Sequence, residues 1–459
     1  MRPLACLAAL VLAASPGGTP RAFTPPPAAV TTYEGRVWLE GHYRRPGECR
    51  EYRSRQVFRT DGRDNARLDW YAWAPDDTTP PSPETFLVTG RRVFHRDAPG
   101  EPWVEYAGGH ARAARFQAFA GMPALLGQPR AGAPLGGVGE HESWGRSAGR
   151  LDRYTRLRPH PRLGDVCDSI AFAWGAATDA PDSVATALYS RDSNWRARHA
   201  RTAYVAEAQA DSLFAAPAGA QPAAADDEDD ASGPPPAPVE RAPGLWSFDL
   251  DDIDSRTLVV EFADHVAVIE CAVGSANGER LVDAIRAKWP AKPIRYALFS
   301  HHHPHYTGGL RALIAAGATV ITTPGNDSLV RAIAQRRFTL RPDRLARHPR
   351  APRVVTYRDS TRLADAANGV ELFDYGARSQ HTDEFTVFWF PRQRLLFESE
   401  LGWVTVDGAP RASRRAKALL AWAAERSLDV ATVVQGWPER ATAPVLSRAT
   451  LDSLVAARK

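Results

Sequence analysis

The chain has 459 residues, of which 44% are hydrophobic and 24% charged, a composition typical of a globular protein long enough to bury more than one core. Its formal net charge is only +4 and no basic stretch stands out, so we expect no nucleic-acid partner. Two domains are the default expectation for this length.

The N-terminal residues have the layout of a secretory signal peptide. In MRPLACLAALVLAASPGGTPRAF, one basic residue precedes an apolar run from Leu4 to Ala14, and small residues and prolines follow. This predicts a signal peptide over residues 1–22, and cleavage near Ala14 and cleavage near Ala22 both remain open. Cys6 lies inside the run, which argues against a lipid anchor, and no later stretch reaches transmembrane length. We therefore expect an exported protein, periplasmic or extracellular, with no transmembrane segment.

Residues 24–214 predict a β-rich N-terminal domain. Two segments each place a glycine-containing turn, at Asp61-Gly62 and at Thr89-Gly90, between apolar or aromatic runs, which indicates hairpins. Tryptophans such as Trp38 and Trp70 supply bulk for a sheet to bury. The pattern carries no readable chemistry, so capture of a small-molecule substrate and docking of a protein partner both stay open for this domain.

The histidines and cysteines of this region are scattered. Lone histidines are usually surface or hydrogen-bonded core residues, so we assign no role to His42, His95, His110, His141, His160 and His199. After signal cleavage three cysteines would remain, Cys49, Cys167 and Cys271, which are odd in number and show no CxxC spacing. Idle thiols are favoured over a bond between Cys49 and Cys167.

Residues 215–244 read as a linker, because they are rich in alanine, proline and acid and offer almost nothing to bury. From Leu245 to the end of the chain, strands and helices alternate in a mixed pattern. We expect strands within 256–272, 294–300, 318–323, 353–357, 370–376, 385–391, 394–401 and 430–436, and helices within 278–289, 308–317, 326–337, 414–427 and 447–458. Such a mixture indicates an α+β domain of sheets covered by helices over residues 245–459.

The stretch FSHHHPHYTGGL, residues 299–310, places a histidine cluster directly after a predicted strand. If the chain stays extended, His301 and His303 project to the same side, and Pro304 favours this because it biases the preceding residue away from helical geometry. His305 has the same parity but follows the proline, so its direction is less certain. His302 points the other way. Two imidazoles on one side suit a zinc ion.

A third ligand must come from elsewhere in the chain. His381 stands at the start of a predicted strand and Glu400 ends the next one. The ends of neighbouring strands are where open sheets gather functional groups. Three histidines with an open position for water form a known catalytic zinc arrangement.

With these blocks in place, residues 245–459 resemble the metallo-β-lactamase superfamily. HHHPHYTGG aligns without a gap to its motif His-x-His-x-Asp-His followed by x-Gly-Gly. The later blocks GARSQHTDEFTVFWFPRQRLLFESEL and VVQGW look like its next two motifs. The resemblance implies an αββα sandwich, here preceded by the β-rich N-terminal domain. It also implies that His301, His303 and His381 are the ligands of the family's first metal, all three present.

The departures from the family pattern fall on the second metal. Its positions are held here by His305, Tyr306, Glu400 and Trp437, of which only the acid keeps its character, as glutamate in place of the usual aspartate. A second zinc is therefore not expected. Tyr306 fills the empty position or hydrogen-bonds a substrate oxyanion, and Trp437 caps the same space.

Three hypotheses follow. In the first, one zinc on the three histidines activates water toward an ester, thioester, lactam or phosphoester of an unknown small-molecule substrate, with Glu400 or His305 as general base. In the second, His301, His381 and Glu400 hold a mononuclear iron, as in the superfamily's sulfur dioxygenases. In the third, the domain keeps the fold, with or without structural metal, as a catalytically inactive binding module.

Overall fold

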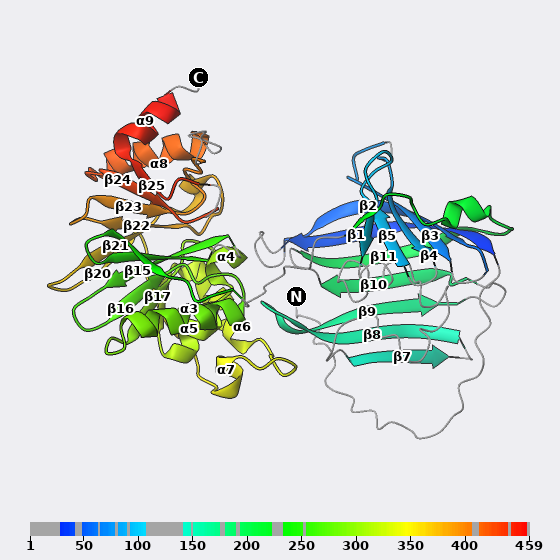
Figure 1. Ribbon diagram of the computed structural model, residues 1–459, viewed down its shortest axis with the longest axis horizontal. Helices are drawn as coiled ribbons and strands as arrows, with labels where there is room; N and C mark the ends of the chain where they lie inside the picture. Colours follow the sequence, from blue (N-terminus) through cyan, green and yellow to red (C-terminus); the bar gives the residue numbers. More distant parts are fainter. Residues whose placement is uncertain are drawn as a thin grey trace.

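The computed structural model describes thirteen stretches of the chain, and the predicted signal peptide lies outside them. These are residues 28–41, 48–62, 65–78, 81–89, 92–106, 141–147, 150–174, 180–189, 193–222, 233–250, 254–405, 413–438 and 442–456. His42 and His110 also lie outside them. Figure 1 shows a sheet built from the N-terminal half beside a compact arrangement of sheets and helices built from the C-terminal half.

The N-terminal half forms one 12-stranded sheet in the order β12-β6-β5-β4-β3-β2-β1-β11-β10-β9-β8-β7. Its strands are β1 (Ala29–Gly41), β2 (Arg50–Thr60), β3 (Ala66–Trp73), β4 (Glu84–Thr89), β5 (Arg92–Arg96), β6 (Val104–Tyr106), β7 (His141–Ser147), β8 (Arg150–His160), β9 (Gly164–Ala173), β10 (Ser183–Tyr189), β11 (Ser193–Ala206) and β12 (Gln221–Pro222). Both predicted hairpins are confirmed, as β2–β3 and β4–β5.

Alternation along these strands explains the sheet. In β9 and β10 every second residue is buried, so one face of each strand packs and the other meets solvent. The pairing of β1 with β11 joins the two meanders into one sheet, since the first strand lies beside one of the last. Tyr33, Val37, Ile170 and Phe172 form part of the core on the buried face.

The C-terminal half contains two further sheets. The first is seven-stranded, with β13 (Pro238–Ala242), β14 (Leu245–Leu250), β15 (Ser255–Glu261), β16 (Val266–Ile269), β17 (Ile294–Leu298), β18 (Thr319–Thr322) and β19 (Arg353–Thr356) in chain order. The second is six-stranded, with β20 (Ser360–Ala364), β21 (Gly369–Asp374), β22 (Thr386–Phe390), β23 (Leu395–Glu398), β24 (Thr432–Gln435) and β25 (Val445–Ser447). The mixed α+β class expected from the sequence is confirmed.

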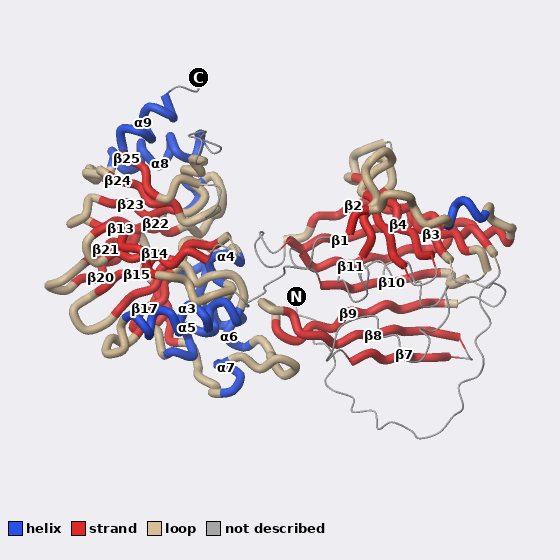
Figure 2. Tube along the Cα trace, in the orientation of Figure 1, coloured by secondary structure: helices blue, strands red, loops and turns tan. Residues whose placement is uncertain are grey.

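Helices cover the outer faces of these two sheets. They are α3 (Ser275–Lys288), α4 (Pro304–Thr307), α5 (Leu310–Ala316), α6 (Asp327–Gln335), α7 (Arg344–Arg347), α8 (Ser413–Glu425) and α9 (Arg448–Ala456). One apolar cluster joins the first sheet to α3, α5, α6 and α7, another joins the second sheet to α8 and α9, and a third lies between the sheets. Figure 2 shows the two helix groups on opposite sides of the strands.

The segment expected as a linker, 215–244, carries strands toward both its ends. β12 pairs with β6 in the N-terminal sheet, and β13 pairs with β14 in the first C-terminal sheet. Cys49, Cys167 and Cys271 are free thiols. Within the described residues, none of the helices is both long enough and apolar enough to cross a membrane.

Candidate metal centre

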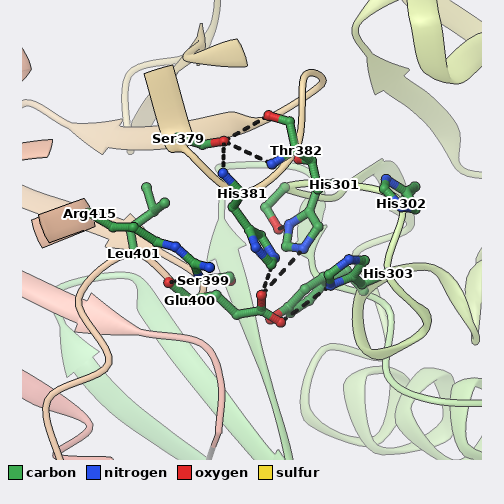
Figure 3. Close-up of polar contacts among 12 residues, drawn as sticks. His301, His302, His303, Ser379, His381, Thr382, Ser399, Glu400, Leu401 and Arg415 are labelled. Carbon is green, nitrogen blue, oxygen red and sulfur yellow. Dashed lines mark hydrogen bonds and ion pairs between the residues drawn. The ribbon is translucent and has the colours of Figure 1, made fainter. Parts of the chain in front are cut away.

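Four side chains from three separate segments converge at one edge of the C-terminal sheets. His301 and His303 follow β17, His381 precedes β22, and Glu400 follows β23. One potential ligand atom from each residue lies within 4.8 Å of the others. The structure thus brings together all four residues that the sequence indicated as metal ligands (Figure 3).

The histidine rings present different nitrogens to this centre. His301 Nδ1 hydrogen-bonds Ser300 Oγ at 2.9 Å, which leaves Nε2 facing Glu400 Oε2 at 3.9 Å. His303 instead turns Nδ1 toward Glu400 Oε1, at 3.4 Å, and His381 turns Nε2 toward Glu400 Oε2. A ring whose second nitrogen has its own partner is held in one tautomer and one orientation, as metal-binding histidines require.

Two packing contacts fix the loops that carry these rings. His301 stacks on Phe385 with ring centroids 4.8 Å apart, and Ser300 O accepts a hydrogen bond from Thr386 N at 2.7 Å, which ties the two sheets together beside the centre. Ser379 Oγ accepts hydrogen bonds from the backbone N–H groups of His381 and Thr382, both at 3.1 Å (Figure 3). Ser379 therefore holds the backbone at His381 in place, a role that the sequence did not indicate.

Glu400 sits in a strained turn. Its φ is 65°, a left-handed conformation that is uncommon for a residue other than glycine. The buried carboxylate of Glu398 accepts hydrogen bonds from the backbone N–H groups of Leu401 (2.6 Å) and Gly402 (3.0 Å), and Arg415 Nη1 donates to Glu400 O at 3.1 Å. These contacts hold the turn so that Glu400 points at the histidines.

A second buried acid lies beneath the centre. Glu270 accepts hydrogen bonds from Ser300 N at 3.2 and 3.3 Å and from Ser399 Oγ at 2.8 Å. It therefore links the residue before His301 to the residue before Glu400. Burial raises the pKa of Glu270 to about 8 and that of Glu398 to about 7. Sequence reasoning missed both acids, whose only signal is a charged residue at the end of an otherwise apolar strand.

Aromatic rings pack together beside the four converging residues. His305 lies in α4 and packs on Trp437 with ring centroids 4.8 Å apart, and Trp403 packs on the other side of Trp437 at 5.3 Å. Tyr306 is fully buried and donates a hydrogen bond from its hydroxyl to Glu400 Oε1 at 3.1 Å. His305 is not among the four converging residues.

Burial and mutual charge shape the electrostatics of this site. Burial, followed by the neighbouring His303, lowers the pKa of His301 well below its usual value. Burial alone would raise the pKa of Glu400, but its hydrogen bonds with His303 and His381 bring it well below the usual range. Burial and the charge of Glu400 raise the pKa of Tyr306. A negative carboxylate therefore faces His301, whose lowered pKa favours the neutral ring, the state in which imidazole binds metal.

A zinc ion fits this donor set. Ligands at about 2.0–2.1 Å in a tetrahedron lie roughly 3.3 Å from one another, close to the His303–Glu400 separation of 3.4 Å. His301 Nε2 is buried and has no hydrogen-bond partner within the described residues, as a nitrogen awaiting a metal would be. The side chain of His381 is the most exposed of the four at 14%, so the centre approaches the surface there.

Comparisons with known proteins were made over the whole chain. No family model matches, and no curated protein matches. Among solved structures, a metallo-β-lactamase from Pontibacter korlensis is 17% identical over 49% of this chain and 100% of its own, with a TM-score of 0.35. A mono-zinc metallo-β-lactamase from Pseudomonas aeruginosa is 18% identical over 49% and 94%, also at 0.35.

A stereoselective inverting sec-alkylsulfatase from Pseudomonas sp. is 14% identical over 48% of this chain and 40% of its own, with a TM-score of 0.34. The resemblance expected from the histidine motif is confirmed as a structural similarity. At these TM-scores the similarity carries no argument about activity, which has to come from the side chains of the centre.

Proposed function

We propose that the C-terminal domain is a metallo-β-lactamase-type αββα sandwich that holds one zinc ion and hydrolyses a small ester, thioester, lactam or phosphoester. The observation that carries this proposal is the convergence of His301, His303, His381 and Glu400 within 4.8 Å. The alternative, iron held by two histidines and one carboxylate, would leave His303 out of the ligand set. His303 lies 3.4 Å from Glu400 and His301 lies 3.9 Å from it, so His303 belongs to the set as much as His301 does. A set of three imidazoles favours zinc over iron.

Zinc in this position would lower the pKa of a bound water toward 7 and polarise a carbonyl or phosphoryl oxygen. The chain's own acid and hydroxyl supply the remaining functions. Glu400 is the proton acceptor, since its carboxylate lies among the three rings and is oriented by Tyr306. The Tyr306 hydroxyl has one proton, so it would donate to an oxyanion on the substrate only in place of Glu400. His305, packed on Trp437, is the second candidate for the base.

The N-terminal residues support a proposal about location. The apolar run followed by small residues and prolines supports export, to the periplasm or outside the cell. The large N-terminal sheet then serves substrate capture or the docking of a protein partner in that compartment. Detection of the mature N-terminus by sequencing the secreted chain tests this; a chain that keeps Met1 in the cytosol would contradict it.

One observation favours a second function, that of an inactive binding module with a structural metal. Three imidazoles and the Glu400 carboxylate together make four ligands, and a zinc site with four protein ligands is closed to water. Because Glu400 is one methylene longer than the aspartate usual in the family, its carboxylate reaches the rings of the first-metal histidines. The role of Glu400, base or fourth ligand, therefore decides between the two functions.

The substitution Glu400→Gln separates them. For a hydrolase, zinc stays at about one equivalent on the three histidines while kcat falls by about 100- to 10,000-fold, as expected for loss of a general base. For a closed structural site, zinc affinity falls and turnover is absent in both proteins. The exposed Glu425, paired with Arg378, provides a matched control, because Glu425→Gln should leave zinc content and turnover unchanged.

Elemental analysis of protein purified without added metal comes first, followed by a panel of thioester, lactone, β-lactam and phosphodiester substrates. Zinc with turnover of any class supports the hydrolase. Zinc without turnover of any substrate would support the inactive binding module. Bound iron would instead support a dioxygenase. Protein that holds no metal near neutral pH would contradict every metal-dependent function.

A further inference from the structure

A turn of the N-terminal sheet is bonded to the C-terminal domain. Between β8 and β9, Pro161 O accepts a hydrogen bond from Ser275 N at 3.1 Å, and Asp165 N donates to Arg337 O at 2.6 Å. Gly164 has a φ of 80°, and a Cβ there would lie 1.9 Å from Arg337 O, so only glycine fits. Figure 1 shows this end of β8 and β9 facing α6 and α7.

The side chain of Asp165, the acid of this turn, bonds to the same region of the C-terminal domain. The Asp165 carboxylate accepts hydrogen bonds from Thr339 N at 2.8 Å, Thr339 Oγ1 at 2.5 Å and Leu340 N at 3.1 Å. The turn is therefore held by four hydrogen bonds to the segment after α6 and by one to Ser275 at the start of α3, and the Asp165 carboxylate accepts three of them.

A cavity of ≈ 130 Å³ lies between the two domains beside this turn. Arg162 and Asn194 line it from the N-terminal sheet, and His302, Thr307 and Arg336 line it from the C-terminal domain. A single water needs about 10–15 Å³ of such space, so the cavity has room for several waters. It is large enough for a small ion or a single charged group.

Arg162, the first arginine of this cavity, forms no ion pair with an acid among the described residues. Arg162 is only 5% exposed, and its Nε and Nη2 have no hydrogen-bond partner within the described part of the chain. Arg311, also buried, shows the usual solution: it makes two hydrogen bonds to Asp343, at 2.6 and 2.9 Å, and donates to three backbone carbonyls. A buried guanidinium without such partners is costly.

The second arginine adds to the same positive charge. Arg336 Nη1 donates to Arg162 O at 2.8 Å, which brings its guanidinium to the backbone of the first arginine. Burial, followed by the positive charges of Arg162 and Arg311, lowers the pKa of Arg336 to about 10. Asp343 is engaged by Arg311, and Glu40 is the acid that lines the cavity. Two guanidiniums thus face one carboxylate and the neutral groups of Asn194 and Thr307.

We propose that this interdomain cavity binds a small oxyanion, a phosphate, sulfate or carboxylate group, between Arg162 and Arg336. Guanidinium groups match the oxygens of such anions with paired N–H donors, and both arginines line the cavity.

The cavity shares a wall with the metal centre but is a separate site. His302 and Thr307 line it, while Thr307 Oγ1 donates to the carbonyls of His302 and His303 at 3.2 and 3.0 Å. In Figure 3 His302 lies apart from the three converging rings. The inference does not depend on the proposed hydrolase function, because no metal ligand takes part in binding the anion.

Calorimetric titration of the full chain with inorganic phosphate, with chloride adjusted to hold ionic strength constant, tests the proposal. One phosphate per chain is expected to bind, and Arg162→Gln and Arg336→Gln should each weaken binding about tenfold or more, the usual consequence of losing charge-assisted hydrogen bonds. Sulfate, acetate and phenyl phosphate, titrated in the same way, distinguish a free tetrahedral ion, a carboxylate and a phosphate carried on a larger molecule.

Matched variants keep the test informative. Arg341→Gln removes an exposed arginine from the same segment and should leave the affinity unchanged, whereas Glu40→Gln removes the competing acid and should tighten binding. Phosphate should raise the Tm of the parent protein and not that of Arg162→Gln. Equal affinity in Arg162→Gln and Arg341→Gln would overturn the proposal, as would an absence of saturable binding for all four anions below roughly 10 mM.

Discussion

Both halves of the molecule bury histidines, and they use them in different ways. In the N-terminal sheet, His95 contacts Glu84 at 2.7 Å and His199 contacts Ser54 at 3.0 Å, each ring with a partner on a nearby strand. In the C-terminal domain, His301 and His303 instead turn toward a shared point together with residues from distant segments. Histidines are buried in both halves, but within the described residues more than one histidine converges only in the second. The N-terminal group consists of a single histidine, His95, with Glu84 and Asp97.

The comparison teaches what distinguishes a structural histidine from a candidate ligand. His199 Nε2 has Ser54 Oγ, which also accepts a hydrogen bond from Trp70 at 2.8 Å, so the ring completes a local chain of partners. His301 Nε2 has no hydrogen-bond partner within the described residues, and it lies 3.9 Å from a carboxylate. A buried nitrogen left over after its neighbours are paired is the stronger sign of function.

The largest effect is expected when one histidine ring is removed from the metal centre, and removal of one histidine ring from the N-terminal sheet is its control. A four-ligand structural zinc site is worth about 10–16 kcal/mol, so His301→Ala should lower zinc affinity by about 100- to 1,000-fold, through the loss of one ligand. His199→Ala should leave zinc content unchanged. Competition with a chromogenic chelator measures both, and full zinc retention in His301→Ala would refute the assignment of this ring.

The second prediction concerns acid and the N-terminal sheet. Burial lowers the pKa of His199 to about 4, below the ordinary value of 6.5. The folded state therefore binds fewer protons than the unfolded state, and stability present above pH 6.5 is lost as pH falls toward 4, by up to about 3 kcal/mol. The protection of the β2 and β11 amides, which is their exchange rate relative to the intrinsic rate at the same pH, should fall over this range.

His199→Gln is the control for this pH effect, because glutamine does not titrate in the range. Its β2 and β11 peptides should exchange at rates that depend on pH only through intrinsic amide chemistry. If the parent and His199→Gln lose protection in parallel between pH 6.5 and 4, the acid sensitivity of the sheet belongs to another group.

Much of the C-terminal fold could be predicted from periodicity. The strands around Asp264 and His265 appear as β15 and β16, and the helix expected at 278–289 is observed at Ser275–Lys288. Short-range pattern suffices here because alternation and helical spacing are set by which face is buried. At the start of α6, Asn326 makes no side-chain cap bond to the helix and instead donates to Thr323 Oγ1 at 3.2 Å.

Other features depend on contacts between distant segments. Pro304 keeps the residue before it extended, as expected, since His303 has a φ of −61° and a ψ of 149°. Pro304 itself begins α4, so His305, whose direction the sequence left open, turns toward Trp437. The supports of the centre, Glu270 and Glu398, show as isolated acids in the sequence. The hydrogen bonds of Glu270 exist only once β16, β17 and β23 are assembled, so no local pattern encodes them. Glu398 instead bonds the backbone of its own turn, at Leu401 and Gly402.

The third prediction concerns the removal of one serine hydroxyl group from each half of the molecule. Ser300 Oγ holds His301 Nδ1 at 2.9 Å, so Ser300→Ala should free the ring to rotate and lower zinc affinity by about 10- to 100-fold, the usual cost of losing such a partner. Ser54→Ala removes the equivalent partner of His199 and should not change zinc binding. Equal affinities in the two variants would show that the Phe385 stack alone orients His301.

The smallest effect is expected at the aromatic side of the pocket, where Trp437 stands in place of the family's last histidine. Trp437→His returns one imidazole beside His305, but Tyr306 still fills the adjoining space and keeps its hydrogen bond to Glu400. Two imidazoles without an acid of their own bind zinc weakly, so stoichiometry should stay at one equivalent, with affinity changed less than about tenfold. A second equivalent in Trp437→His alone would mean that Glu400 is shared between two ions, and that the centre is closer to a two-metal site than its aromatic packing indicates.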